Sequence, residues 1–243
     1  MITISNYIYT KEEIYKCIKH VADMTKDTEQ NIIDFLCKIE EYKEIKIFFP
    51  TKIQLSKKSW LDVFIIPKNF INFDELMAIK PEQRGKVKIM GKDIDVPRYQ
   101  KTYGKNYTFS GIKHIADPIP DILEKVRLWT NGLGYGFFNQ VLVNWYDDGN
   151  SYIGKHSDDE RELIKGSPVF SISLGAERNF RIRPKKDVNA LFEGNFYDIM
   201  LKNEDVVVMC GDMQKEFTHE VPKITKKIKV GPRINITLRQ FPI

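Results

Sequence analysis

The chain has 243 residues, 42% of them hydrophobic and 29% charged, which are the proportions of a globular protein and exclude a disordered, collagenous or repeat protein. Its 38 Lys and Arg residues against 33 Asp and Glu residues give a formal net charge of +5, a mild excess that suits a polyanionic partner without proving one. The sequence shows no membrane-length apolar run, no signal peptide at its start and no CxxC pair among its 3 cysteines. We therefore expect an intracellular protein, of the nucleus or the cytoplasm, that does not span a membrane.

The first 60 residues differ in pattern from the rest of the chain. Apolar residues recur at helical spacing over residues 14–21 and 32–39, which predicts two amphipathic helices. A short strand is expected at 47–49, where Pro50 closes it. We interpret residues 1–60 as an N-terminal helical extension of unknown role; helices that simply pack on the main core are an equally good interpretation.

From residue 61 onward the pattern changes to short apolar runs. A strand is predicted at 61–66, a helix at 73–79, then a basic segment, and a second helix at 122–130. Further short strands are predicted at 138–146, 169–174, 179–182, 197–201, 206–210 and 234–241. Short strands separated by Gly, Asn and Asp turns, with almost no helix between them, indicate an antiparallel sandwich, barrel or jelly roll.

A histidine and a carboxylate stand two residues apart in the segment His156-Ser157-Asp158. On an extended backbone, residues i and i+2 face the same way, so both side chains can reach one ion. A further histidine, His219, lies beyond several predicted strands. Two histidines and one carboxylate make the facial triad of non-haem Fe(II) oxygenases, although an HxD pair by itself is more often an ordinary surface or core feature.

Polar and apolar residues alternate strictly in the last predicted strand, so four polar side chains share one face: Arg233, Asn235, Thr237 and Arg239. A solvated face is one interpretation. If that face is buried, the two arginines need anionic partners, and a dicarboxylate would satisfy both. Asn144 and Tyr146 form a second such pair, which either completes the hydrogen bonding of a bound acid or faces water.

Taken together, these motifs resemble the AlkB family of Fe(II)- and 2-oxoglutarate-dependent dioxygenases, most closely its branch that dealkylates nucleic acids. The resemblance rests on Asn144-x-Tyr146, on HSDDERELIKGSP at 156–168, on His219 and on RINITLR at 233–239. It extends upstream through VPR at 96–98 and YTFSG at 107–111, and covers about residues 61–243. It implies an α+β, mainly β protein with a double-stranded β-helix (jelly roll), flanking helices and a nucleotide-recognition lid at about 84–111.

The resemblance also implies roles for individual residues. His156, Asp158 and His219 become the iron ligands and catalytic centre. The co-substrate 2-oxoglutarate is expected to contact Asn144, Tyr146, Arg233 and Arg239, with Asn235 and Thr237 as secondary supports. We expect Arg233 at the distal carboxylate. The implied reaction oxidises an N-alkyl carbon, converts 2-oxoglutarate to succinate and CO2, and releases the alkyl group as an aldehyde.

A base cannot be oxidised inside a duplex, so the implied enzyme flips it out or takes it from a single strand. Substrate contacts are implied for Met90, Arg98, Tyr107, Phe109, Ser110, Asp159 and Glu160. Phe109 and the His156 ring could sandwich the base, and the two acidic residues could meet its exocyclic edge or else form a solvated turn.

A basic hairpin arm is predicted at 84–91, and the resemblance implies that Met90 takes the place of the apolar wedge that enters the base stack. Methionine is less rigid than an aromatic ring, so single-stranded substrates remain an alternative. Basic residues on and after the arm are expected to contact phosphates: Lys86, Lys88, Lys92, Arg98, Lys101 and Lys105.

The sequence thus predicts a monomeric oxidative demethylase of DNA, acting on lesions such as 1-methyladenine and 3-methylcytosine, with RNA as a second substrate. An RNA demethylase or a protein hydroxylase on the same scaffold is one alternative. A nucleic-acid binding module with an inactive site is another, and the complete triad counts against it.

Overall fold

The computed structural model describes residues 50–89, 92–109, 112–225 and 228–242, and the chain divides into two compact units between Phe49 and Pro50. The helices and the strand predicted within 14–49 lie outside the described residues. The division falls before the boundary suggested near residue 60, because β1 (Thr51–Gln54) pairs with β2 (Ser59–Ile65) and both belong to the main sheet. Residue 60 lies inside a strand.

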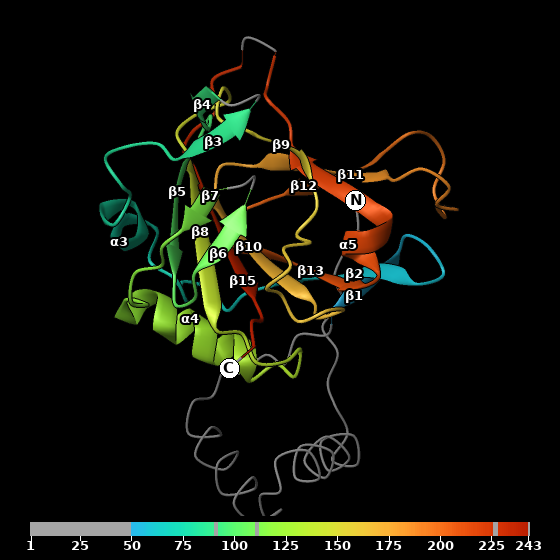
Figure 1. The fold of residues 1–243 in the computed structure, drawn as a ribbon, viewed down its shortest axis with the longest axis horizontal. Coiled ribbons are helices and arrows are strands. Elements are labelled where there is room, and N and C mark those ends of the chain that lie inside the picture. The colour runs from blue at the N-terminus through green and yellow to red at the C-terminus, as the bar shows by residue number, and fades with distance from the viewer. Residues whose placement is uncertain (1–49, 90–91, 110–111, 226–227, 243) are drawn as a thin grey trace, which may run out of the picture. The chain divides into compact units, whose positions relative to one another are not determined.

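Two antiparallel sheets form the core of the second unit (Figure 1). The larger sheet has the order β1-β2-β13-β10-β15-β8-β5, and adds to the first two strands β13 (Asp205–Gly211), β10 (Val169–Gly175), β15 (Arg233–Arg239), β8 (Gln140–Tyr146) and β5 (Tyr99–Tyr103). The smaller sheet has the order β12-β11-β14-β9, made of β12 (Tyr197–Leu201), β11 (Arg178–Pro184), β14 (Phe217–Val221) and β9 (Ile153–His156). The strands from β8 to β15 divide into β8-β15-β10-β13 and β9-β14-β11-β12, which is the topology of a double-stranded β-helix. The predicted jelly roll is confirmed.

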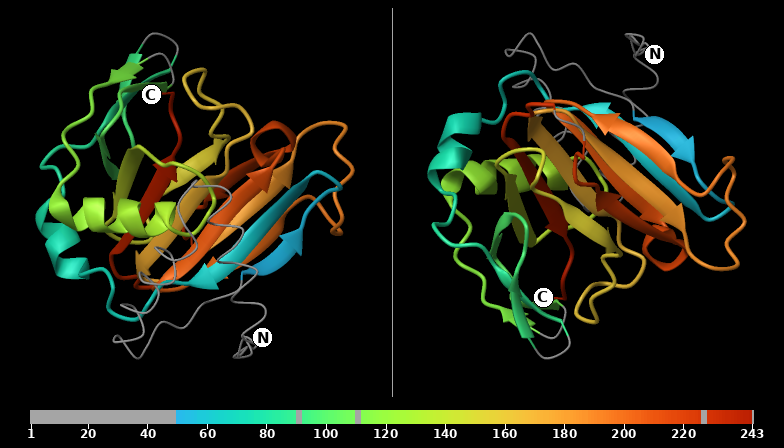
Figure 2. Two further views of the ribbon diagram at one scale, coloured as in Figure 1. Left: turned by 90° about the horizontal axis from the view of Figure 1, so that it is seen from below. Right: turned by 90° about the horizontal axis from the view of Figure 1, so that it is seen from above.

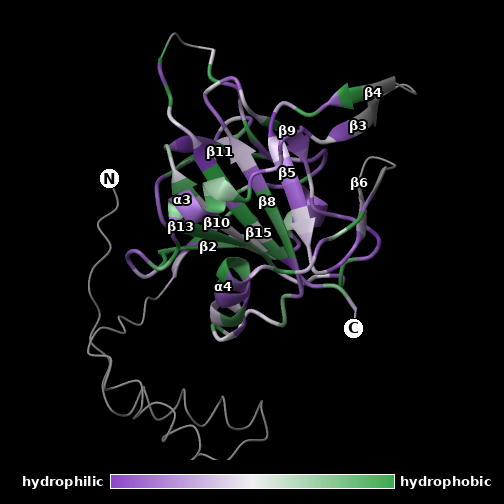
Figure 3. Cartoon of the chain, turned by 90° about the vertical axis from the view of Figure 1, so that its left-hand side faces the viewer, coloured by the Kyte–Doolittle hydropathy of each residue, from purple (hydrophilic) through white to green (hydrophobic). Residues whose placement is uncertain are grey.

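Helices cover the outer face of the larger sheet, as Figure 2 shows for α3 (Phe73–Ala78) and α4 (Asp121–Asn131). Leu123 and Val126 of α4 share one core cluster with Ile234 and Ile236 of β15. Figure 3 shows the hydrophobic colour along β8 and β15 in the middle of this sheet, whereas β5 at its edge is largely hydrophilic. Because side chains alternate along a strand, the apolar residues of β15 face these helices and its polar residues face the smaller sheet.

The space between the sheets holds a second apolar cluster, which includes Phe180, Met209 and Phe217. The short helix α5 (Met213–Glu216), which the sequence pattern did not predict, precedes β14 and buries Met213 in this cluster. These apolar side chains fill one part of the interior, so the polar face of β15 is buried next to them and not in solvent.

Two hairpins form small sheets of their own. β3 (Lys86–Ile89) pairs with β4 (Lys92–Asp95), at the place where a hairpin arm was predicted, and β6 (Tyr107–Phe109) pairs with β7 (Ile112–His114). Met90 and Ser110 lie outside the described residues, as does the side chain of Phe109. None of the helices in the described part of the chain is long and apolar enough to cross a membrane.

Candidate active site

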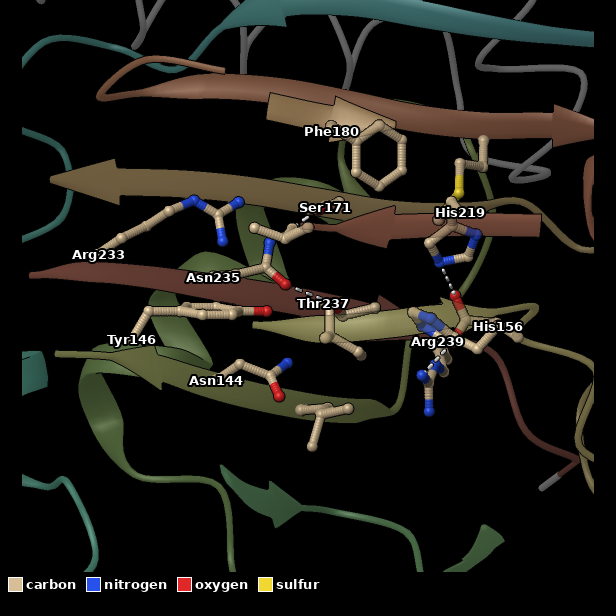
Figure 4. Close-up of a pocket in the computed structure, with 15 residues that line it drawn as sticks. Asn144, Tyr146, His156, Ser171, Phe180, His219, Arg233, Asn235, Thr237 and Arg239 are labelled. Carbon is tan, nitrogen blue, oxygen red and sulfur yellow. Dashed lines mark hydrogen bonds and ion pairs between the residues drawn. The ribbon is translucent and has the colours of Figure 1, made fainter. Parts of the chain in front are cut away.

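A cavity lies between the two sheets (Figure 4). Every residue that the sequence assigned to iron or to 2-oxoglutarate lines it: His156, Asp158, His219, Asn144, Tyr146, Arg233, Asn235, Thr237 and Arg239. These residues come from four strands, β8, β9, β14 and β15, and from the loop after β9, and these segments are distant in sequence. The fold therefore brings all of them to one place.

The three proposed metal ligands meet at one end of this cavity. His156 ends β9 and lies directly opposite His219 of β14 in the antiparallel register, and Asp158 follows in the next loop. Their potential ligand atoms all lie within 4.8 Å of one another. His219 Nε2 is 3.3 Å from Asp158 Oδ2. This donor set and spacing fit a divalent iron ion, which these three side chains would hold.

The protonation of two of these groups also suits a metal. His156 Nδ1 lies 2.9 Å from the carbonyl oxygen of Gly154; a carbonyl only accepts, so Nδ1 carries the hydrogen and the ligating lone pair is on Nε2. Burial, and then the neighbouring His219 ring, lower the pKa of His156 to about 3. Burial by itself would raise the pKa of Asp158, but Arg239 and His219 outweigh it and keep the pKa low. Neutral imidazole and ionised carboxylate are the forms that bind metal.

Arg239 lies at the metal end of the cavity. Its guanidinium pairs with Asp158, and Nη1 is 3.1 Å from Glu160 Oε1. Burial works against its charge, yet the two carboxylates raise the pKa of Arg239 above its usual value. A second group bonded to a ligating carboxylate fixes the orientation of that ligand. We infer that Arg239 orients Asp158.

The two acidic residues after Asp158 differ in their surroundings. The Glu160 side chain is only 4% exposed, and burial raises the pKa of its carboxyl group. Asp159 is exposed. The solvated acidic turn considered from the sequence therefore describes Asp159 but not Glu160.

The opposite end of the cavity holds Arg233, which is 1% exposed. Its Nη2 donates to Ser173 Oγ at 2.8 Å, while Nε and Nη1 have no hydrogen-bond partner among the described residues. Its guanidinium carbon lies 5.0 Å from the centre of the Tyr146 ring. Burial lowers the pKa of Arg233. A buried charge with two unused donors is costly unless an anion pairs with it. A carboxylate in this cavity would supply that partner, so the residues fit a dicarboxylate that spans it.

Between the two ends, Asn235 has both sides of its amide bonded within the protein. Nδ2 donates to Ser171 Oγ at 2.8 Å and to the Ile172 carbonyl at 3.0 Å, and Oδ1 accepts from Thr237 Oγ1 at 3.1 Å. This network is compatible with the supporting role suggested for Asn235 and Thr237.

The structure describes only part of the expected substrate contacts. Tyr107 is 3% exposed, with its ring stacked on His114 at 4.8 Å and the Arg239 guanidinium 5.5 Å from its centre. Arg98, expected at a phosphate, is buried instead and donates to Asn144 Oδ1 at 2.7 Å. The reason is register: β5 pairs with β8, which brings the segment after β4 over the inner face of the sheet.

Sequence reasoning missed Ser171, Ser173 and Arg178. The serines alternate with apolar residues in β10, a period-two signal like that of β15 which could have identified them. Arg178 is 2% exposed and donates to the backbone carbonyls of Asp148, Ser151 and Pro222. Backbone partners leave no trace in a sequence, so nothing pointed to it.

Comparison with known proteins agrees with this geometry. The sequence matches the 2OG-Fe(II) oxygenase superfamily over residues 77–239, and the chain belongs to this family. Among its relatives is the DNA oxidative demethylase ALKBH2 of Homo sapiens, 37% identical over 162 residues that cover 64% of this chain and 61% of the relative. Another is the alpha-ketoglutarate-dependent dioxygenase alkB homolog 3 of Mus musculus, 32% identical over 150 residues, or 59% of this chain and 51% of that protein.

These relatives confirm the predicted resemblance to the AlkB family. The chain spans about 61% of the length of the human ALKBH2. The solved structure of OsALKBH1 superposes with a TM-score of 0.53 at 20% identity, over 78% of this chain and 100% of that one. At that identity the similarity shows a shared fold.

Proposed function

We propose that this chain is an Fe(II)- and 2-oxoglutarate-dependent dioxygenase that oxidatively demethylates DNA. The observation that carries the proposal is one cavity with a facial triad at one end and the buried Arg233 guanidinium at the other, where Nε and Nη1 have no partner among the described residues. Only a ligand that reaches a metal and also bears a distant anionic group uses both ends. The relatives named as DNA oxidative demethylases support the choice of DNA.

Bound iron would supply oxygen activation, coupled to the decarboxylation of 2-oxoglutarate to succinate. The protein's part is to hold and orient. Arg233 binds one carboxylate of the co-substrate, and Arg239 keeps Asp158 in place as a ligand. Leu142, Phe180 and Met209 line the cavity with apolar surface and exclude water from the reacting groups.

The substrates that we propose are N-alkylated bases such as 1-methyladenine and 3-methylcytosine. Alkylation at these ring nitrogens makes the base cationic, and Glu160 is an acidic side chain buried next to Arg239 at the metal end. Tyr107 supplies an aromatic wall next to Arg239. We propose that a flipped base binds next to Tyr107, and that a protein with such a substrate acts inside the cell, in the nucleus or the cytoplasm.

The test is mass spectrometry of methylated oligonucleotides after incubation with the protein, Fe(II), ascorbate and 2-oxoglutarate. We expect demethylated DNA and an equal amount of succinate. Demethylation of RNA alone would favour an RNA demethylase, and succinate without loss of methyl groups from either polymer would favour another substrate such as a protein. If the protein forms neither succinate nor demethylated oligonucleotide, it is a binding module and the proposal is wrong.

A further inference from the structure

Arg98 is a buried arginine, 5% exposed, and its two side-chain hydrogen bonds with described residues go to neutral amide oxygens. Nε donates to Asn144 Oδ1 at 2.7 Å, and Nη2 donates to Gln100 Oε1 at 2.8 Å. Burial lowers the pKa of Arg98. Keeping an arginine here is costly, which suggests that its donors serve a purpose that an apolar side chain could not.

The first consequence concerns the direction of the Asn144 amide. A guanidinium has donors and no acceptor, so the atom of Asn144 that faces Arg98 must be the oxygen. The amide nitrogen then points to the other side, toward the cavity that Asn144 lines (Figure 4). A donor in this place can bond an oxygen of a bound acid. The reversed amide would present an oxygen and repel that acid.

The second consequence concerns the β3–β4 arm. The backbone N–H of Val96 donates to the Gly85 carbonyl at 2.9 Å and closes the base of the arm, two residues before Arg98. Gln100, the other partner of Arg98, packs against Gly85 so closely that a Cβ there would lie 3.0 Å from Gln100 Nε2 and 3.1 Å from its Cγ. Gln100 therefore contacts both Gly85 and Arg98, and Arg98 contacts Asn144, so these residues connect the base of the arm to the cavity.

We infer that Arg98 is a positioning residue, which holds the Asn144 amide with its donors toward 2-oxoglutarate and is itself held by Gln100 at the base of the arm. The inference rests on the proposed function, because 2-oxoglutarate is the acid that the amide meets. It assigns Arg98 to the co-substrate and not to a DNA phosphate. Asn144 is the contact, and Arg98 acts through it.

The test is calorimetric titration of 2-oxoglutarate into the full chain loaded with Mn(II), which needs no turnover. Arg98→Met replaces the buried cation by an apolar side chain of similar length. We expect Arg98→Met and Asn144→Ala each to raise the Kd of 2-oxoglutarate about tenfold. The double variant should bind no more weakly than Asn144→Ala alone, because removing Asn144 already removes what Arg98 positions.

Two further variants separate positioning from charge. Arg98→Lys keeps the charge but cannot bond both amides with a planar fork, so its Kd should rise as well. Arg181→Met is the matched control: this arginine is bonded to Asp198 on the smaller sheet, away from the cavity lining, and its loss should leave the Kd unchanged.

Gly85→Ala tests the arm from a distance and does not touch the cavity. The added Cβ must displace Gln100 by a few tenths of an ångström, and we expect the Kd of 2-oxoglutarate to rise about two- to fivefold. Gly231→Ala is the control, because its Cβ would meet nothing closer than 3.9 Å. If circular dichroism shows that Arg98→Met is unfolded, the comparison of Gly85→Ala with Gly231→Ala tests the inference instead.

Each result has a distinct meaning. A wild-type chain that does not bind 2-oxoglutarate overturns the proposed function and the inference with it. If Asn144→Ala weakens binding while Arg98→Met, Arg98→Lys and Gly85→Ala do not, the function stands and the inference is wrong. Additive losses in the double variant would also overturn it, since Arg98 would then act independently of Asn144.

Discussion

Arg233 is buried, and two of its donor atoms have no hydrogen-bond partner among the described residues, which supports the proposal that it serves a ligand and not the stability of the fold. Arg233→Met should therefore weaken 2-oxoglutarate binding by about two orders of magnitude or more. The same change should raise the free energy of unfolding of the ligand-free protein by about 1 kcal/mol or more, because it removes an unpaired buried charge. Urea titrations with and without 2-oxoglutarate measure both effects. A variant that is less stable and still binds would show that the arginine serves the fold.

Asp158 is the carboxylate of the triad and also the partner of Arg239. We expect Asp158→Ala to lose bound iron and all demethylation, since the remaining two histidines leave the ion without its anionic ligand. Arg239 keeps Glu160 as a partner, so the fold should persist. Metal analysis after dialysis is the measurement. Asp121→Ala, at the exposed start of α4, is the control and should keep its metal.

At the scale of elements, the turn after β13 depends on a glycine. Gly211 has φ +68°, and a Cβ there would lie 2.0 Å from the Lys58 carbonyl oxygen. Gly211→Ala should lower the free energy of unfolding by about 3 kcal/mol or more, from backbone strain and a clash that backbone atoms cannot relieve. Gly194→Ala has φ +85° with nothing within 4 Å, so it should cost only about 1 kcal/mol. Thermal melts of the two variants separate the effect of backbone strain, which both have, from that of the clash, which only Gly211→Ala has. Equal losses of stability in the two variants would contradict the role of the clash.

The β3–β4 arm is the element predicted to distinguish duplex from single-stranded DNA. Met90, which follows β3, lies outside the described residues. If Met90 fills the gap left by a flipped base, Met90→Ala should slow repair of duplex DNA about tenfold and spare single strands. Lys86 is exposed at the start of β3, and Lys86→Ala should weaken both substrates and reduce the salt dependence of binding by about one phosphate contact. The measurement is the repair rate of each variant on duplex and single-stranded oligonucleotides of the same sequence. Equal losses for Met90→Ala would favour a single-strand or RNA enzyme.

For the molecule as a whole, the two sheets are complete within residues 50–243. Every residue that lines the cavity also lies in this unit. We therefore expect a chain that starts at Pro50 to fold with a cooperative transition and to bind 2-oxoglutarate as the full chain does. Circular dichroism and calorimetry of the shortened chain check this. An unfolded product would mean that the first 49 residues are needed for the core.

Strand and helix positions were predictable wherever apolar periodicity is strong. β10, β12 and β13 lie within one residue of their expected ranges. β10 and β13 are short, almost continuously buried runs, and the exposure of side chains alternates along β12, so each has a pattern that predicts a strand. β5 and β9 were not predicted. Each is short, and most of its residues are polar or only partly buried, so neither has a hydrophobic pattern to detect. Their positions come from pairing with β8 and β14.

The sequence by itself determined which side chains of β15 share a face, because the side-chain period of a strand is two. It also placed His156 and Asp158 within reach of one ion. Tertiary structure decided the rest. The strand register sets His219 opposite His156, Arg239 pairs with Asp158, and two donor atoms of Arg233 have no partner within the part of the chain that the structure describes. Local spacing cannot encode these contacts, since they depend on how distant strands align and on which charges are buried together.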